Sequence, residues 1–150
     1  MAEVPTGKLS DVSTELSARR TGMSFQRTRM SADRTLMSVI RTSLSLIGFG
    51  FTIFQFFEKL QQADVLTAAH APRNFGTALV ALGIVMLALG IVYHVRFMLG
   101  LREQRKRMTA EGLIHGESGF PPSLTLVTAA VLLLIGIAAI VSMVFRIGPF

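Results

Sequence analysis

The sequence predicts an all-α membrane protein with three transmembrane helices, its N-terminus cytoplasmic and its C-terminus outside. Of the 150 residues 51% are hydrophobic and yet 16% are charged, because the apolar residues collect in separate blocks. Three blocks are long enough to cross a hydrocarbon core of about 30 Å. Lysine and arginine gather at one end of these blocks, which predicts their orientation in the membrane.

The first predicted span covers about residues 36–57 and carries a polar stripe. Its charge-free part, 42–57, has 16 residues and is about 24 Å long, so spanning takes in Arg41 or thins the bilayer. Polar or small residues spaced alternately by four and three form one side of a helix: Arg34, Ser38, Arg41, Ser45, Gly48, Thr52 and Gln55. We expect this stripe to face protein or water, and the apolar faces to meet lipid.

The stripe continues upstream in a heptad repeat, Arg-Thr-x-Met/Leu-Ser-x-x, over residues 20–26, 27–33, 34–40 and 41–47. Its four arginines lie about 10.5 Å apart along one side of a helix. Before Ser31 the repeat has too few apolar residues to bury a face, and Gly22 lowers helix propensity. We therefore predict a basic arm over 1–30, mobile or lying on the membrane surface. A duplication without function in its first half would give the same pattern.

A three-span membrane domain is predicted over 31–150, with Ser31 or Asp33 capping its first helix. The second span is expected at about 75–96, after a loop in which Pro72 blocks helix continuation. A basic loop then leads to the third span, 124–145, which has no charged residue. Four glycines are candidates for close helix packing: Gly76, Gly83, Gly90 and Gly136.

Basic residues set the predicted topology. Seven lysines and arginines lie in the segment up to Arg41 and five in the connection between the second and third spans. Only Lys59, Arg73 and Arg146 lie at the other end. The positive-inside rule then places the N-terminus in the cytoplasm, and we expect a bacterial cytoplasmic (inner) membrane. The net charge of +6 fits membrane lipids as partners, so no nucleic acid is expected.

No catalytic, cofactor or metal site is predicted, and we expect no enzyme. The chain has no cysteine, and none of His70, His94 and His115 has a second ligand at metal-binding spacing. We interpret His94, near the end of the second span, as an interfacial residue in preference to a ligand or a proton relay. No acidic residue lies within a span, which disfavours proton-coupled transport.

The arginines of the stripe allow two interpretations. In the first, several copies of the first helix surround an axis, and Arg34 and Arg41 form cationic rings that concentrate anions. Ser38, Ser45 and Thr52 would then line the path, with Gln55 at its far mouth. In the second, the arginines contact lipid phosphates and the small residues only allow helices to pack. The residue types alone favour the second interpretation.

The stretch DRTLMSVIRTSLSLIGFG at 33–50 resembles the signature of small three-span membrane proteins of the YidH type, known as domain of unknown function 202. That signature has an acidic or amide residue, Arg-Thr, and a second Arg-Thr leading into Leu-Ile-Gly-Phe-Gly. Asp33, Arg34 and Arg41 match it, and Tyr93-x-x-Arg96 is similar to the end of the family's second span. The resemblance covers about 31–145 and implies an integral membrane protein with no known enzymatic activity.

The resemblance also implies a kinship with the membrane domain of the fungal vacuolar transporter chaperone complex, which makes polyphosphate and passes it across a membrane. By that analogy Arg34, Arg41 and Arg96 are candidate contacts for a polyanion or a lipid phosphate. We expect an oligomeric helical module, self-associated or joined to a membrane partner, whose first spans form a basic-lined anion or polyanion path. The alternative is a non-transporting structural adaptor whose basic arm binds anionic lipid or a partner protein. The coincidence of stripe and signature favours neighbouring helices over lipid as the stripe's contacts.

Overall fold

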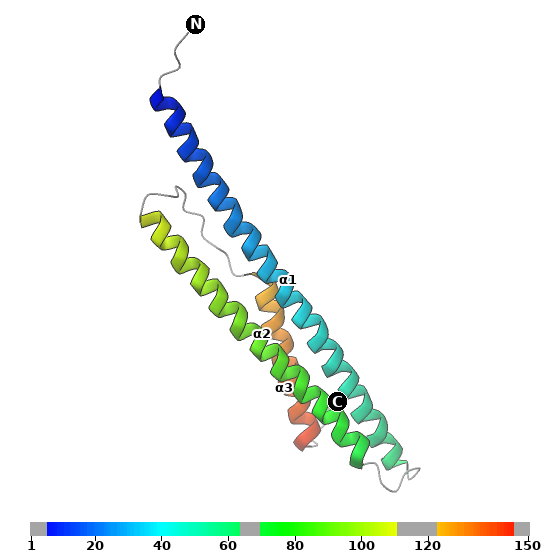
Figure 1. Cartoon of the computed structure of the whole chain (residues 1–150). Coiled ribbons are helices and arrows are strands. Elements are labelled where there is room, and N and C mark those ends of the chain that lie inside the picture. The colour runs from blue at the N-terminus through cyan, green and yellow to red at the C-terminus, as the bar shows by residue number, and fades with distance from the viewer. Residues whose placement is uncertain (1–5, 64–69, 111–122, 146–150) are drawn as a thin grey trace.

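Three α-helices make up the part of the chain that this computed structural model describes, residues 6–63, 70–110 and 123–145. They are α1 (Thr6–Gln62), α2 (His70–Ala110) and α3 (Leu124–Phe145), and no strand occurs in those ranges. α1 and α2 are long rods that run side by side in opposite directions, and the shorter α3 lies beside them (Figure 1). Each helix contains a segment long and apolar enough to cross a membrane. The predicted all-α, three-span class is therefore confirmed, while the direction of crossing stays a prediction.

α1 is much longer than the sequence analysis predicted. It is continuous over 57 residues, or about 85 Å. The predicted helix start at Ser31 or Asp33 is therefore wrong, because both residues lie in the middle of the helix. Outside the apolar segment the helix is supported locally, as where Arg19 pairs with Glu15 at 2.6 Å. The contact of residues 1–30 with a membrane surface stays a prediction.

α2 extends beyond the predicted second span at both ends. Pro72 lies in its first turn, where a missing N–H breaks no intrahelical bond, so it begins the helix instead of blocking it. Likewise His70, predicted in a loop, is the first residue of α2. The basic connection predicted as a loop is helical as far as Ala110 and carries an exposed pair between Arg107 and Glu103. His115 and Arg146 lie outside the described residues.

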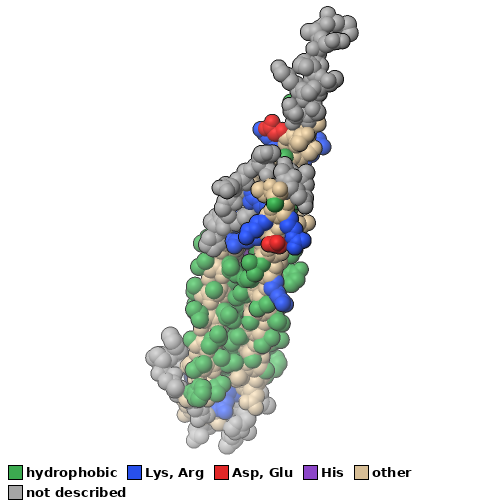
Figure 2. Space-filling view, turned by 90° about the vertical axis from the view of Figure 1, so that its left-hand side faces the viewer, with side chains coloured by type: hydrophobic (Ala, Val, Ile, Leu, Met, Phe, Trp, Pro, Cys, Tyr) green, Lys and Arg blue, Asp and Glu red, His purple; other side chains and the backbone are tan. Residues whose placement is uncertain are grey.

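α3 coincides with the predicted third span. Ser123 precedes its first residue and caps it, since the Leu126 N–H donates to the Ser123 Oγ at 3.3 Å. The helix has 22 residues and a length of about 33 Å, close to the thickness of a hydrocarbon core. We call the part of the bundle level with α3 the apolar belt. Figure 2 shows basic side chains gathered beyond one end of this belt.

α1 and α2 approach each other through glycine. A Cβ on Gly76 would lie 2.7 Å from the carbonyl oxygen of Gly50, which leaves no room for any side chain. At Gly83 and Gly90 the equivalent atom would lie 2.8 Å from Ile47 and 2.6 Å from Val39. The seven-residue spacing of these glycines matches large side chains on α1, so the two helices pack closely. Gly136 of α3 sits in the same way, 3.1 Å from a carbon of Ile84.

Two small hydrophobic clusters show which parts of the three helices lie side by side. The first joins Leu36 and Ile40 of α1 to Leu87 and Ala129, and the second joins Ile47, Phe54, Val80 and Met143. α3 is therefore parallel to α1 and antiparallel to α2. Many large apolar side chains on all three helices are exposed, as expected of a bundle whose outer surface faces lipid.

Candidate functional site on the outer face of α1

The heptad repeat lies on the side of α1 that the rest of the described chain leaves uncovered. In residues 20–47 every fixed position (Arg, Thr, Met/Leu and Ser) is exposed except the half-buried Thr21. Every variable position is buried or half-buried except Gln26. The variable positions are the third, sixth and seventh of each heptad, and within the belt they pack against α2 and α3. We call the side with the fixed positions the outer face of α1 and the opposite side its inner face.

The predicted polar stripe belongs to the outer face. Arg34, Ser38, Arg41, Ser45, Gly48 and Thr52 are exposed, and Gln55 is half-buried. A Cβ added at Gly48 would meet no atom within 4 Å, so no helix of the chain packs there. The expectation that protein covers this stripe is thus not met inside one chain. Its neighbours are therefore a second protein, water or lipid headgroups.

Arg41 lies within the level of the apolar belt. Its neighbour Ile40 shares a cluster with Leu87 and Ala129, and Ala129 follows Leu124, the first residue of α3, by about 7.5 Å along the helix. Leu87 precedes Val95, the last residue before Arg96, by eight positions, or about 12 Å along the helix. No carboxylate among the described residues pairs with Arg41 or Arg34. Among the described residues Arg41 is therefore an exposed, unpaired cation at the start of the uncharged run of α1, about 7.5–12 Å from the basic ends of the uncharged segments of α3 and α2.

Three hydroxyl groups of the outer face are bonded within α1 itself, whereas the Ser38 hydroxyl has no such bond among the described residues. Thr42 donates to the Ser38 carbonyl at 3.1 Å, Ser45 to the Arg41 carbonyl at 3.0 Å and Thr52 to the Gly48 carbonyl at 2.8 Å. A Ser or Thr that bonds back to the preceding turn needs no other partner in an apolar medium. The cost of exposing this face to lipid therefore comes from its arginines.

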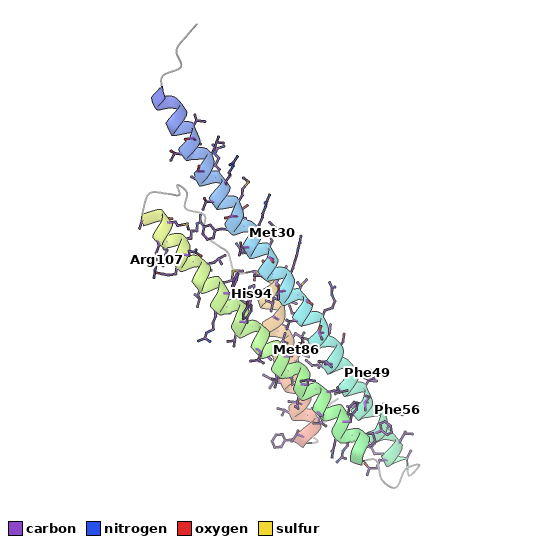
Figure 3. The ribbon with its side chains drawn as sticks, viewed as in Figure 1. Met30, Phe49, Phe56, Met86, His94 and Arg107 are labelled. Carbon is purple, nitrogen blue, oxygen red and sulfur yellow. The ribbon has the colours of Figure 1, made fainter. Side chains whose placement is uncertain are left out.

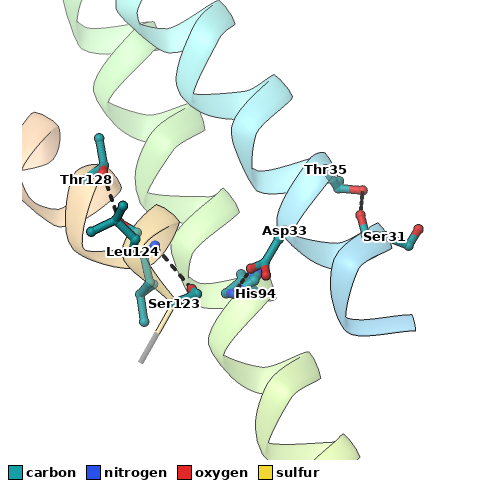
Figure 4. A network of polar contacts seen from close by, with 8 residues as sticks. Ser31, Asp33, Thr35, His94, Ser123, Leu124 and Thr128 are labelled. Atoms are coloured by element: carbon teal, nitrogen blue, oxygen red, sulfur yellow. Dashed lines mark hydrogen bonds and ion pairs between the residues drawn. The ribbon is translucent and has the colours of Figure 1, made fainter. Parts of the chain in front are cut away.

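A polar contact between α1 and α2 was not predicted from the sequence. The buried His94 places its Nε2 atom 3.5 Å from the Oδ1 atom of Asp33 (Figure 4). That oxygen is itself buried and has no hydrogen-bond partner among the described residues, so the contact is one of proximity and not a hydrogen bond. His94 points from α2 toward α1 (Figure 3), which corrects its interpretation as a lone interfacial residue. Asp33 is the sole acidic residue between Glu15 and Glu58, and that isolation was the available signal.

The third predicted arginine, Arg96, is exposed on α2. Arg96 follows His94 by two residues, and Arg34 follows Asp33 by one. Because Asp33 and His94 are in contact, both arginines lie at the basic end of the belt. A groove of about 210 Å³ opens here between the two helices. Its rim includes Tyr93 and Phe97, whose rings stack at 6.4 Å. In the described ranges no three His, Cys, Asp or Glu side chains gather as a metal site.

Comparison with known proteins adds one finding. Residues 27–100 match the model of a family described as Domain of unknown function (DUF202). Comparison with curated proteins and with solved structures gave no match. The match includes the arginines of the polar stripe and the Asp33–His94 contact. It confirms the resemblance carried by 33–50, while the kinship with the vacuolar transporter chaperone complex stays a prediction.

Proposed function

Residues 27–100 make this three-helix integral membrane protein a member of the DUF202 family, and we propose that its α1 helices associate and line a basic path for an anion or polyanion. Arg34 and Arg41 would bind the anion, with Arg96 at the entrance. Ser38, Ser45 and Thr52 would continue the path, and Gln55 would mark its far end. No catalytic step and no cofactor belong to this proposal.

The depth of Arg41 carries the proposal. A charged side chain within a membrane span is costly, by up to about 2.5–3.5 kcal/mol at the centre of the helix on insertion scales, and such residues generally face protein or a water-filled cavity. Nothing in the described chain covers Arg41. Association of several α1 helices around an aqueous axis removes Arg41 from lipid and supplies the missing neighbours of the stripe.

The chemistry of the stripe favours phosphate-like anions. A guanidinium group offers a planar fork of donors that matches phosphate oxygens, and it stays charged at every physiological pH. Arg34 and Arg41 are separated by one heptad, about 10.5 Å, so a flexible polyanion can contact both. The positive-inside rule would place this entrance at the cytoplasmic face.

The test is anion flux through the purified protein in liposomes, after its mass in mild detergent has been measured. We expect an oligomer whose phosphate or polyphosphate flux falls at least tenfold in the Arg34→Ala/Arg41→Ala variant. Arg107→Ala serves as the control, because it removes an exposed cation far from the stripe. An oligomer whose flux survives the double substitution refutes the path, and a monomer in every lipid refutes the association.

A structural adaptor is the second candidate, and the hydroxyl bonding favours it. Because Thr42, Ser45 and Thr52 are bonded to their own helix, the arginines are the groups that most need a partner, and a lipid phosphate drawn into the membrane can be the partner of Arg41. In that case the basic arm would bind anionic lipid or a partner protein. Anionic vesicles would then slow amide exchange in residues 12–30 without any anion flux.

A further inference from the structure

The outer face of α1 has a large-residue side and a small-residue side. With a turn of 3.6 residues, the Met or Leu of each heptad lies about 60° to one side of the arginine, and the Ser and Thr lie about 40° and 100° to the other. The large residues are about half exposed: Met23, Met30, Met37 and Leu44 at 53%, 54%, 47% and 52%. The arginine line separates this ridge from a strip of Ser and Thr.

The threonines of the strip can be covered without breaking hydrogen bonds. Thr28, Thr35 and Thr42 donate to the carbonyls of Ser24, Ser31 and Ser38 at 2.9, 3.1 and 3.1 Å. A threonine bonded in this way presents its methyl group, so burying it under an apolar side chain leaves no donor unsatisfied. A methionine of a neighbouring helix can therefore pack on the threonine methyl groups of the strip, as Val39 packs on Gly90 of α2.

The period of the face restricts its partner. A strict seven-residue repeat stays in contact with a neighbour only if both helices supercoil with the same period. From Met23 to Leu44 the ridge extends for 21 residues, or about 32 Å, from beyond the apolar belt into it. The partner must cross that boundary too. α2 and α3 already occupy the inner face, and another α1 has the required period and position.

We infer that the partner of the outer face is a second copy of this chain, with the Met/Leu ridge of one α1 packed on the Ser/Thr strip of the next. All copies enter the membrane in one direction, so their α1 helices are parallel and Met30 of one is level with Ser31 of its neighbour. Such a contact joins two different surfaces, and copies that meet in this way form a ring when the rotation between neighbours closes. The arginine line then faces the axis.

This contact rests on the proposed function for the association of α1 helices, and it adds which surfaces meet. A two-fold contact would behave differently, because it would place Met30 against Met30 and arginine against arginine. The ring instead places arginines on the axis at successive heptads, where anions screen them. It also extends the contact outside the membrane, as far as Leu16.

Cysteine cross-linking distinguishes these arrangements, since the chain has no cysteine of its own. Met30→Cys and Ser31→Cys are made in chains with tags of different size and are co-expressed in one membrane. A short bismaleimide is used because it tolerates distances that a disulfide does not. We expect a covalent dimer of mixed size in the co-expressed sample, at least fivefold above either variant alone. Both positions are exposed, so neither substitution disturbs the fold.

The control pair is Leu99→Cys and Gly100→Cys, two adjacent exposed positions on α2, which should give only background product. Cross-linking of Met30→Cys with itself overturns the ring in favour of a two-fold contact. A mixed product no stronger than the α2 control overturns the contact altogether. Flux measured on the same membranes separates the two proposals. A mixed product without arginine-dependent flux upholds the contact and refutes the path, and the reverse refutes the contact alone.

Discussion

The two faces of α1 use the same seven-residue period in different ways. On the inner face Val39 and Ile47 meet Gly90 and Gly83 of α2, so large side chains of one helix fill the positions where the other has none. On the outer face an equally regular row of methionines has nothing against it in the described chain. α1 therefore has two packing surfaces, and the fold of a single chain uses only the inner one.

The faces also differ in their polar groups. Ser43 is fully buried on the inner face and its Oγ has no hydrogen-bond partner among the described residues, whereas Thr42 and Ser45 on the outer face are bonded to their own helix. Buried polar groups generally have a partner. The inner face is thus dominated by close packing, and on the outer face Thr35, Thr42, Ser45 and Thr52 are bonded to their own helix.

The largest effect is expected from placing a side chain in the glycine contact. Gly76→Leu forces a side chain into a space where even a Cβ would lie 2.7 Å from backbone, so α1 and α2 must separate. We expect a loss of about 3 kcal/mol in the free energy of unfolding, the upper end of the overpacking range. Reversible unfolding in mixed detergent micelles, followed by circular dichroism, measures it.

Gly48→Leu is the matched variant on the outer face, where a Cβ meets nothing within 4 Å. The stability of the single chain should change by less than about 1 kcal/mol, while self-association weakens. If Gly48→Leu destabilises the chain as strongly as Gly76→Leu, the outer face is packed within one chain and the comparison between the faces is wrong.

A smaller effect is expected from the one polar contact between α1 and α2 at the basic end. A double-mutant cycle with Asp33→Asn and His94→Gln should give a coupling of about 1 kcal/mol, because the pair is close but poorly aligned as a hydrogen bond. Unfolding of all four proteins under the same conditions provides the coupling energy. A value indistinguishable from zero would mean that the two residues are neighbours only by packing.

The sequence predicted the three spans because each needs about 20 apolar residues, a requirement that composition alone reveals. The bounds of α3 agree with that prediction since Ser123 caps its start and Phe145 is the last residue before the charged Arg146. The lengths of α1 and α2 were not predictable in the same way. Residues 12–31 bury little, and their helix is continuous with the membrane segment and held by local pairs such as Arg19–Glu15.

The alignment of the candidate site residues along one side of α1 was predictable, but whether that side is exposed or packed against α2 was not. Spacing places Arg34 and Arg41 on one side of a helix, but it cannot say whether α2 packs on that side or the opposite one. That choice depends on which residues fit the glycines of α2, and Val39 and Ile47 fit them. The Asp33–His94 contact was unpredictable for a related reason, since the two residues are 61 positions apart and meet only through this packing.

The smallest effect concerns two serines on opposite faces of α1. Ser43→Ala removes a buried hydroxyl that has no partner, so stability should stay unchanged or rise by up to about 1 kcal/mol. Ser45→Ala removes an exposed hydroxyl bonded to the Arg41 carbonyl and should change stability by less than about 0.5 kcal/mol. The same micelle unfolding assay compares both variants with the parent chain. A clear loss at Ser43 would reveal a partner for its hydroxyl, and the inner face would then hold α1 and α2 together by a hydrogen bond as well as by shape.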